Sequence, residues 1–510
     1  MNGEVTSKHA RLLITVAVMA ATVMQVIDTT IVNVAIPHMQ GQLGANRDEI
    51  SWVLTSYLVS SGIFMPLTGF FADKFGQKRY LLLSIAGFII SSALCGLSQN
   101  LNEIILFRLS QGAFGAALAP LSQAIMVKTY PLEERGKAMA IWGLGIMVGP
   151  ILGPTLGGYL TQAFSWRWTF FINVPVGLFA LALGWRVVPD SEKRERRLDW
   201  TGFIFLAIAI ASLQYILDRG NQLGWFSSRI IVAMTVISLL GFLAYIDHSI
   251  RKGENALFRM RIFRDRNFTT ASIVMATMGL GMFGAALMQP EMLEGLLNYP
   301  ALTAGLVMAP RGIASMISMF AVGRLIGKVD ARLLIAVGAA LAATGSWMMT
   351  WYSLNIDFFW VILPIVIQGL GMGLIFVPIA TLAYATLPPQ DSAEAAGMFS
   401  LFRTIGSSIG ISLVTMVLTQ HTQIAWNQLG GHINVFNPAL YSYLQHIGLN
   451  LHEAVTPAVL AHVLYQQANM VAFNDSFMFI TWSFIVIFPL LLLMRRAGLK
   501  NHKPPAPVQE

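Results

Sequence analysis

Long apolar runs separated by short polar segments make up most of this chain. A helix needs about 20 mainly apolar residues to cross a bilayer, and fourteen runs of this kind are present. They lie near 12–36, 51–71, 80–98, 102–127, 138–161, 166–188, 201–217, 230–247, 269–291, 302–326, 332–351, 359–386, 395–418 and 476–494. The pattern predicts an all-α integral membrane protein with fourteen transmembrane helices.

Two charged linkers, Pro189 to Asp199 and Arg251 to Arg266, divide these runs into groups of six, two and six. We therefore expect a six-helix half at 1–188, two extra helices with basic linkers at 189–267, a second six-helix half at 268–494 that includes an outer loop at 419–475, and a tail at 495–510. Weak repeats support two like halves. The sequence around Gly69 and Lys78 is echoed around Gly323 and Lys328, and parallel repeats of this kind are typical of secondary transporters.

Composition agrees with a membrane protein. Hydrophobic residues make up 55% of the chain and charged residues 11%, against about 25% charged in soluble domains. The net charge of +8 comes from basic residues clustered between apolar runs, a distribution typical of membrane orientation rather than nucleic-acid binding. The single cysteine, Cys95, excludes an intramolecular disulfide, and the histidines of 419–475 lack metal-ligand spacing. We expect no metal site.

The positions of lysine and arginine predict the orientation, because positive residues remain on the cytoplasmic side. With a cytoplasmic N-terminus, the inner segments hold most of these residues, including both linkers and the tail, whereas 419–475 holds none. Both termini are expected in the cytoplasm. The first apolar run is longer than the core of a signal peptide and is expected to be a retained span.

Three segments resemble the fourteen-span drug:proton antiporter family of the major facilitator superfamily, in its EmrB-like branch. They are Ile27 to Pro37, Gly69 to Lys78, and Trp166 to Gly177. A fourth segment resembles the glycine-proline motif of exporters in this superfamily, with Gly145, Gly149, Pro150, Gly153, Pro154, Gly157 and Gly158. The resemblance covers nearly the whole chain.

This resemblance implies a proton-coupled multidrug efflux antiporter in the bacterial cytoplasmic (inner) membrane. It would export amphipathic or hydrophobic toxic compounds by alternating access of its two halves, without a cofactor. It implies a conformational latch on the cytoplasmic side, with Asp73 near the start of the 395–418 span; the latch residues are Gly69, Asp73, Gly76, Lys78 and Arg79. In the EmrB-like branch, an EmrA-like periplasmic adaptor of the membrane fusion type and an outer-membrane channel extend the path.

Two charges inside the apolar runs point to proton coupling. Charges within a membrane are costly, so they indicate function by default. Asp28 and Arg108 lie at similar depths from the outer side of their spans, and we expect them to meet. Separation of this pair would let Asp28 take up a proton and couple the gradient to transport. The alternative is a static ion pair that joins two helices.

Further polar residues in the spans are candidates for a substrate cavity: Gln25, Asn33, Gln111, Gln289, Glu291, Glu294, Arg311, Gln368 and Arg403. Glu291 meets Arg311 only if their two helices pack with those faces together. As alternatives, the two glutamates are interfacial groups in water, the glutamines join helices by hydrogen bonds, and Arg403 is a structural anchor. Likewise, the glycines of 138–161 serve either to limit proton leak or simply to allow close packing.

No enzyme or ATPase motif is present in the sequence. We find neither Gly-x-Ser-x-Gly, His-Glu-x-x-His nor a nucleotide-binding loop, so we expect no enzyme activity and no direct use of ATP. The main competing hypothesis is an exporter with a narrow substrate, such as a fatty acid, a lipid or a metabolite. Residue types do not reveal cavity shape, so the two hypotheses stay open here.

Overall fold

The computed structural model describes residues 7–45, 47–131, 134–191, 193, 198–326, 328–388, 391–434 and 436–494. About 85% of the chain is helical, and the described residues form no strand beyond one isolated bridge. Thirteen described helices are long and apolar enough to cross a membrane. The remaining expected span, 138–161, is the 29-residue helix α8. The all-α membrane fold is confirmed.

The first half contains the first six expected spans. Its elements are α1 (Lys8–Leu43), α2 (Arg47–Ile50), α3 (Trp52–Phe64), η1 (Met65–Leu67), α4 (Thr68–Phe75), α5 (Gln77–Leu97), α6 (Leu101–Gly115), α7 (Leu118–Thr129), α8 (Arg135–Ala163), α9 (Trp168–Phe171) and α10 (Asn173–Val187). Pro66 lies in the 3₁₀ turn that divides the second span. At the start of α6, the Asn100 side chain accepts a hydrogen bond from the Glu103 backbone and so caps the helix.

The extra pair and the second half follow in the expected order. The pair is α11 (Trp200–Arg219) and α12 (Arg229–Lys252), with short turns η3 (Trp225–Ser227), η4 (Gly253–Asn255) and η5 (Met260–Arg264). The second half comprises α13 (Arg266–Pro290), the π-helical η6 (Glu291–Leu296), α14 (Ala301–Leu325), α15 (Ala331–Met349), α16 (Phe358–Ala385), α17 (Ser392–Gly430), α18 (Pro438–His446), α19 (Thr456–Ile485) and α20 (Ile487–Leu493).

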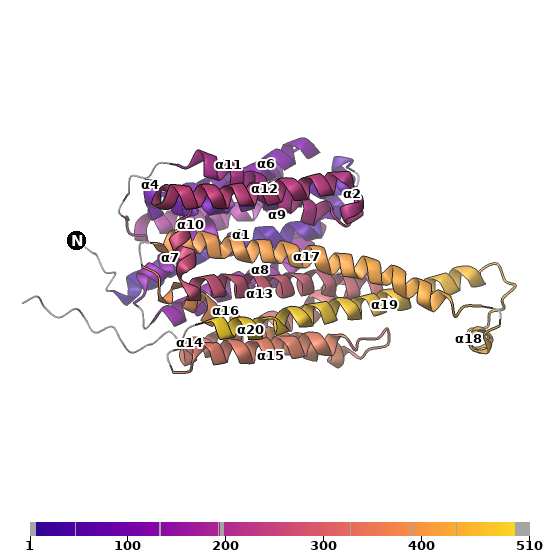
Figure 1. The fold of residues 1–510 in the computed structure, drawn as a ribbon. Coiled ribbons are helices and arrows are strands. Elements are labelled where there is room, and N and C mark those ends of the chain that lie inside the picture. Colours follow the sequence, from indigo (N-terminus) through magenta and orange to yellow (C-terminus); the bar gives the residue numbers. More distant parts are fainter. Residues whose placement is uncertain are drawn as a thin grey trace, which may run out of the picture.

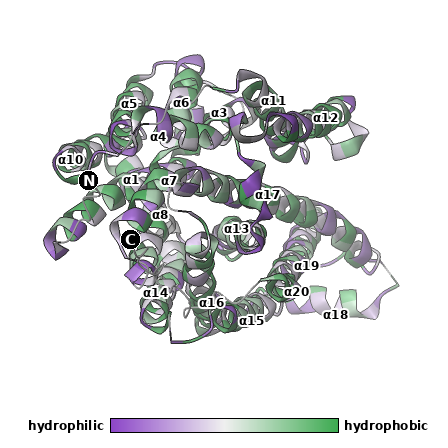
Figure 2. Ribbon diagram, turned by 60° about the vertical axis from the view of Figure 1, so that its left-hand side comes forward, coloured by the Kyte–Doolittle hydropathy of each residue, from purple (hydrophilic) through white to green (hydrophobic). Residues whose placement is uncertain are grey.

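The helices run roughly side by side, with α11 and α12 towards the top of the view and α14, α15 and α20 at the bottom (Figure 1). Helix α11 packs on α3, while α8 packs on α14 and α17 packs on α4 and α7 across the two halves. Hydrophobic residues cover most of the length of the helices (Figure 2). Large apolar side chains such as Leu240, Leu306 and Trp360 are exposed on the outside, as a surface in contact with lipid requires.

The two ends of the bundle differ. We call the end that carries Lys74, Lys78 and Arg79, at the junction of α4 and α5, the basic end. Helix α1 begins at this end (Figure 1). The opposite end, from which α17 and α19 project, is the far end. The tail at 495–510 and the linker residues Arg194, Arg196 and Arg197 lie outside the described residues.

The outer segment at 419–475, in which the sequence indicates an amphipathic helix near Val455 to Met470, is largely helical. Helix α17 continues past 418 to Gly430, and α19 begins at Thr456 with Pro457 in its first turn. No glycine or proline interrupts the chain between Gly410 and Gly430, so the helix extends beyond its apolar part. At 1.5 Å per residue, the 39 residues of α17 span about 58 Å, well beyond a hydrocarbon core of about 30 Å.

Candidate functional site

A buried ion pair joins α1 to α6 in the first half. Nη1 of Arg108 lies 2.8 Å from Oδ2 of Asp28. The Asp28 side chain is 0% exposed and that of Arg108 is 1% exposed. The contact that we expected from the sequence is therefore present, and it is shielded from solvent in this conformation.

Two amides complete the surroundings of the Asp28 carboxylate. Oδ1 accepts a hydrogen bond from Nε2 of Gln111 at 2.9 Å and another from Nδ2 of Asn173 at 2.7 Å. Asn173 also donates to the hydroxyl of Ser92 at 3.0 Å. The network thus includes α5 and α10 as well as α1 and α6. Asn173 and Ser92 were not among the predicted site residues, although Asn173 lies in the Trp166 to Gly177 segment.

Arg108 is held on several sides. Its Nε donates to the carbonyl of Val53 at 3.0 Å, its Nη1 donates to Gln111 at 2.8 Å, and its guanidinium lies 4.3 Å from the ring centroid of Tyr57. A guanidinium over an aromatic face is attracted by the ring quadrupole. These contacts fix the cation beside Asp28.

Three hydrogen-bond donors surround the Asp28 carboxyl group. Arg108, Gln111 and Asn173 all donate hydrogen bonds to its oxygens, and a carboxylate accepts such bonds whereas a protonated carboxyl must also donate one. Loss of these contacts would release α1 from the helices that carry the donors. The arrangement is suited to linking protonation to helix movement.

The polar residues of the second half form separate contacts. Arg311 donates to Gln289, a partner that the sequence did not indicate. Nε2 of Gln368 donates to the hydroxyl of Ser346 at 2.8 Å, which is the helix-to-helix role given as its alternative. Arg403 is half-buried in α17.

The remaining cavity candidates divide by exposure. Glu291 and Glu294 are exposed on η6 at the far end, as interfacial carboxylates would be. Gln25 is buried and lies beside Tyr57 rather than against Asp28 itself, and Asn33, two turns further along α1, is exposed. These four side chains therefore do not form one cluster with Asp28.

The glycines of α8 allow close contact with α1. A Cβ at Gly145, Gly149 or Gly153 would overlap side chains of α1, and one at Gly157 would lie 2.8 Å from the carbonyl oxygen of Ile31. Gly158 is less constrained, with its nearest neighbour at 4.0 Å. The geometry supports the close-packing role, and the side chains of Pro150 and Pro154 lie outside the described residues.

The halves approach each other closely at the basic end. A Cβ at Gly69 of α4 would lie 2.8 Å from Cα of Glu394 in α17, and one at Gly397 would lie 3.1 Å from the carbonyl oxygen of Met65. The predicted latch segment therefore lies against the start of α17. Within it, Gly76 has a φ of +86°, which favours glycine, while Lys78 is half-buried and Arg79 is exposed.

Charged residues of the second linker also reach this junction, although we had interpreted that linker only in terms of orientation. Arg259 pairs with Asp391 at 2.8 Å, and Arg261 pairs with the other oxygen of Asp391 at 3.1 Å. Nη2 of Arg259 lies 4.0 Å from Asp73. In the sequence, the acidic residues Asp391 and Glu394 at the start of α17 were the signal that could have indicated basic partners here.

Asp199, at the start of α11, forms a further charged contact at the basic end. It accepts hydrogen bonds from Nε2 of His248 and Nζ of Lys252, both at 2.9 Å. Burial alone would raise the pKa of Asp199, but the hydrogen bonds from Lys252, His248 and the Gly202 backbone outweigh it and lower the pKa below its usual range. The pair α11 and α12 is thereby joined to the linker that follows it.

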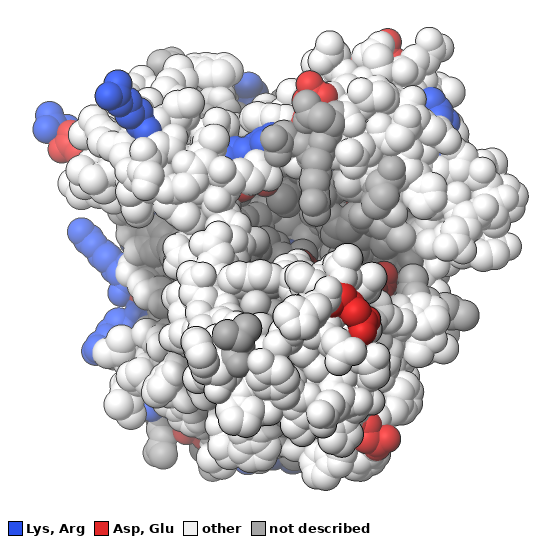
Figure 3. All heavy atoms as spheres, turned by 90° about the vertical axis from the view of Figure 1, so that its right-hand side faces the viewer, with Lys and Arg blue, Asp and Glu red and all other residues white. Residues whose placement is uncertain are grey.

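The far end has a different shape. Figure 3 looks onto this end and shows a hollow between the side chains of the two halves. The basic end holds the close contacts of Gly69 and Gly397. The bundle is therefore closed at the basic end and open at the far end.

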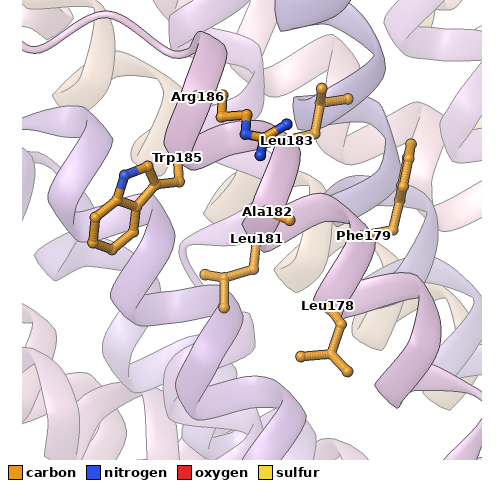
Figure 4. A pocket seen from close by; sticks show the side chains of 7 residues that line it. All are labelled: Leu178, Phe179, Leu181, Ala182, Leu183, Trp185 and Arg186. Carbon is orange, nitrogen blue, oxygen red and sulfur yellow. The ribbon is translucent and has the colours of Figure 1, made fainter.

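Two further grooves lie away from Asp28. One, of about 570 Å³, runs along the outer face of α10 and is lined by Leu178, Phe179, Leu181, Ala182, Leu183, Trp185 and Arg186 (Figure 4). The other, of about 340 Å³, lies in the projecting part and is lined by residues that include Trp426, Ile433 and Leu460. Neither groove contains a member of the Asp28 network.

Comparison with known families decides the classification. The model of the Major Facilitator Superfamily matches residues 18–411. The chain belongs to the major facilitator superfamily. Among curated relatives in this superfamily, the multidrug export protein EmrB of Escherichia coli K12 is 35% identical over 485 residues, covering 94% of each chain. The fatty acid resistance protein FarB of Neisseria gonorrhoeae is 31% identical over 487 residues, covering 94% of this chain and 96% of its own.

Solved structures of superfamily members share the fold. The human organic anion transporter MFSD10 (TETRAN) matches with a TM-score of 0.62 at 14% identity, covering 94% of this chain and 99% of its own. The proton:xylose symporter XylE matches with a TM-score of 0.59 at 13% identity, covering 93% and 95%. The family resemblance and the fold expected from the sequence are both confirmed.

Proposed function

We propose that the protein is a proton-coupled multidrug efflux antiporter that works by alternating access. The observation that carries the coupling is the Asp28 network, a buried carboxylate held by three donors from other helices. The export direction and the drug-like substrates are supported by the similarity to EmrB proteins, which are multidrug export proteins in Escherichia coli and Haemophilus influenzae. No cofactor is needed, because the proton gradient drives transport.

The basic end faces the cytoplasm in this proposal, and the protein lies in the bacterial inner membrane. Lys74, Lys78 and Arg79 lie at that end together with Lys193, Arg259 and Arg261 of the two linkers, whereas residues 419–475 of the projecting part contain no lysine or arginine. Positive residues are retained on the cytoplasmic side. The conformation described above then faces outward, and both termini are cytoplasmic.

The coupling step follows from the geometry. In the outward-facing state, the ionised Asp28 is held by Arg108, Gln111 and Asn173. A proton that enters from the outer side neutralises the carboxylate and weakens all three contacts, since hydrogen bonds to a charged acceptor are stronger than those to a neutral one. Release of α1 then permits the change to the inward-facing state, where loss of the proton restores the network after substrate has bound.

Transport by purified protein in liposomes tests the proposal. With an imposed pH gradient, wild-type protein should move a fluorescent cationic dye, and Asp28→Asn should abolish this movement. The variant should still exchange labelled for unlabelled dye without a gradient, because exchange requires alternating access but no net proton movement. If Asp28→Asn shows normal gradient-driven transport, Asp28 is not the coupling site.

The control for this test is another buried aspartate outside the network. Asp199 is 2% exposed and contacts His248 and Lys252 at the basic end. Asp199→Asn removes a buried carboxylate of the same kind. Because Asp199 also accepts a hydrogen bond from the Leu257 backbone in the linker after α12, the variant should lower the rate of transport but leave its dependence on the gradient unchanged. Equal losses in both variants would indicate damage to the fold rather than to coupling.

A second candidate function is export of fatty acids. FarB is a fatty acid resistance protein, and its similarity covers 94% of this chain. The same liposomes, supplied with a labelled fatty acid, separate the candidates. Movement of the fatty acid without movement of the dye would replace the multidrug proposal with this one.

We also propose an EmrA-like periplasmic adaptor as a partner, leading to an outer-membrane channel. The projecting parts of α17 and α19, together with α18, extend beyond the bundle (Figure 1), and Phe436, Tyr441 and Val455 are exposed there. Exposed apolar and aromatic residues are typical of interaction surfaces. Failure to co-purify with an adaptor encoded beside this protein would count against the proposal.

A further inference from the structure

The linker between α12 and α13 is a packed element of the structure. We call its residues 256–264 the strap. Within it, Leu257, Phe258 and Ile262 are buried. The Leu257 backbone nitrogen donates to Asp199 at 3.3 Å, and the ring of Phe258 packs edge-on against Tyr245 of α12. The strap is therefore fixed to the extra helix pair.

Arg259 carries the positive charge of the strap into the junction between the halves. Its Nη1 lies 2.8 Å from Oδ1 of Asp391, and its backbone nitrogen donates to Oε1 of Glu394 at 2.6 Å. Its Nη2 lies 4.0 Å from Oδ2 of Asp73 in α4. Asp73 belongs to the first half, whereas Asp391 and Glu394 belong to the second.

Closure of the basic end brings these three carboxylates together. Asp391 and Glu394 are nearly fully buried, with 2% and 3% exposed, and Gly69, one turn before Asp73, is packed against Glu394. Like charges that are buried close together disfavour their ionised forms unless a cation compensates them. Arg259, itself only 14% exposed, lies where that compensation is required.

We propose that Arg259 keeps the basic end closed by pairing with carboxylates of both halves. We call this junction of Asp73, Asp391 and Glu394 the gate and Arg259 its clasp. Through the strap, the extra helices α11 and α12 then control how stable the closed gate is. When the halves separate at this end, Asp73 moves away from Asp391 and Glu394, and the clasp loses one side of its contacts. The extra pair then has a defined role in transport. This inference rests on the alternating access proposed above.

Distances between spin labels test the clasp directly. The single cysteine, Cys95, is buried and is replaced in a Cys95→Ser background. Leu83→Cys in α5 and Leu333→Cys in α15 are exposed positions that report on separation of the halves near the basic end. A second pair, Asn102→Cys and Phe359→Cys, reports on the far end.

Arg259→Ala should lower the ratio of closed to open basic ends about tenfold or more, which corresponds to about 1.4 kcal/mol. The far-end pair should show the opposite change. The matched control is Arg251→Ala, since Arg251 is an exposed arginine near the same linker and pairs with the exposed Asp247. It should leave both distributions unchanged.

The charge at position 259 distinguishes the clasp from a general loss of packing. Arg259→Asp should open the basic end more than Arg259→Ala, because it adds a fourth carboxylate to the three already there, whereas Arg259→Lys keeps the positive charge and should keep much of the closed population. An unchanged ratio in Arg259→Ala, an equal shift in Arg251→Ala, or a shift in Arg259→Lys as large as that in Arg259→Asp would overturn the proposal. The measurement needs neither substrate nor gradient, so failure of proton-coupled export would not be mistaken for failure of the clasp.

Discussion

A close backbone contact between the two halves predicts the effect of one added methyl group. In Gly69→Ala, the new Cβ would lie 2.8 Å from Cα and 2.9 Å from Cβ of Glu394. Backbone atoms cannot turn aside as a flexible side chain can, so α4 and α17 must move apart. Overpacking of this kind costs about 1–3 kcal/mol. Because the contact exists only when the basic end is closed, the closed-to-open ratio should fall by about 5-fold to 150-fold.

The label pairs at 83 and 333 and at 102 and 359 measure this shift in purified protein. Gly397→Ala provides a graded comparison, because its Cβ would lie 3.1 Å from the carbonyl oxygen of Met65 and should cause a smaller shift. Gly338→Ala is the matched control. Its Cβ would meet the carbonyl oxygen of Gly371 at 2.8 Å within the second half, so it should lower stability without changing the ratio.

The outcome that refutes this reasoning is an unchanged closed population in Gly69→Ala. A shift in Gly338→Ala as large as that in Gly69→Ala would also refute it, because overlap within one half would then be enough. Slower dye export should accompany the shift in Gly69→Ala, since each transport cycle passes through the closed basic end. Normal export together with a shifted ratio would mean that closure does not limit the rate.

Four further substitutions test individual positions by thermal unfolding in detergent. Asp199→Asn should lower the unfolding temperature at pH 7. The pKa of Asp199 in the folded protein lies below its usual value of 3.8. The ionised carboxylate therefore stabilises the fold above pH 3.8, and this stabilisation disappears as the pH falls through the lower folded-state pKa. Gly76→Ala should cost about 1–3 kcal/mol because of its positive φ, whereas Gly158→Ala, with its nearest neighbour at 4.0 Å, should be tolerated. Thr30→Val removes a 3.0 Å hydrogen bond to the carbonyl of Gly149 and should cost about 1 kcal/mol.

Hydropathy was sufficient to predict the helices and the contact between Asp28 and Arg108. A membrane leaves few options for an apolar run or an isolated charge, because backbone groups must be satisfied within the helix and charges require partners. The family segments also indicated which part of α4 would lie against α17. These predictions depend on one residue or one run at a time.

The partners that were missed depend on packing between distant segments. Asn173 resembles many polar residues in apolar helices, and only the rotation of α10 directs it to Asp28. Arg259 is one of several arginines in its linker, and its contact with Asp391 follows from the path of the strap. Similarly, a polar sequence beyond residue 418 was interpreted as a loop, because hydropathy measures membrane burial and not helix length.

Helix α17 connects the gate to the part of the molecule that lies furthest from it. Glu394 is in its first turn, and its last turn ends at Gly430 in the projecting part. The 36 residues between them correspond to a rod of about 54 Å. A tilt of about 10° around the gate end would move the other tip by about 9 Å. The helix therefore transmits movement at the gate to the projecting part. A protein bound to that part would be displaced each time the gate opens or closes.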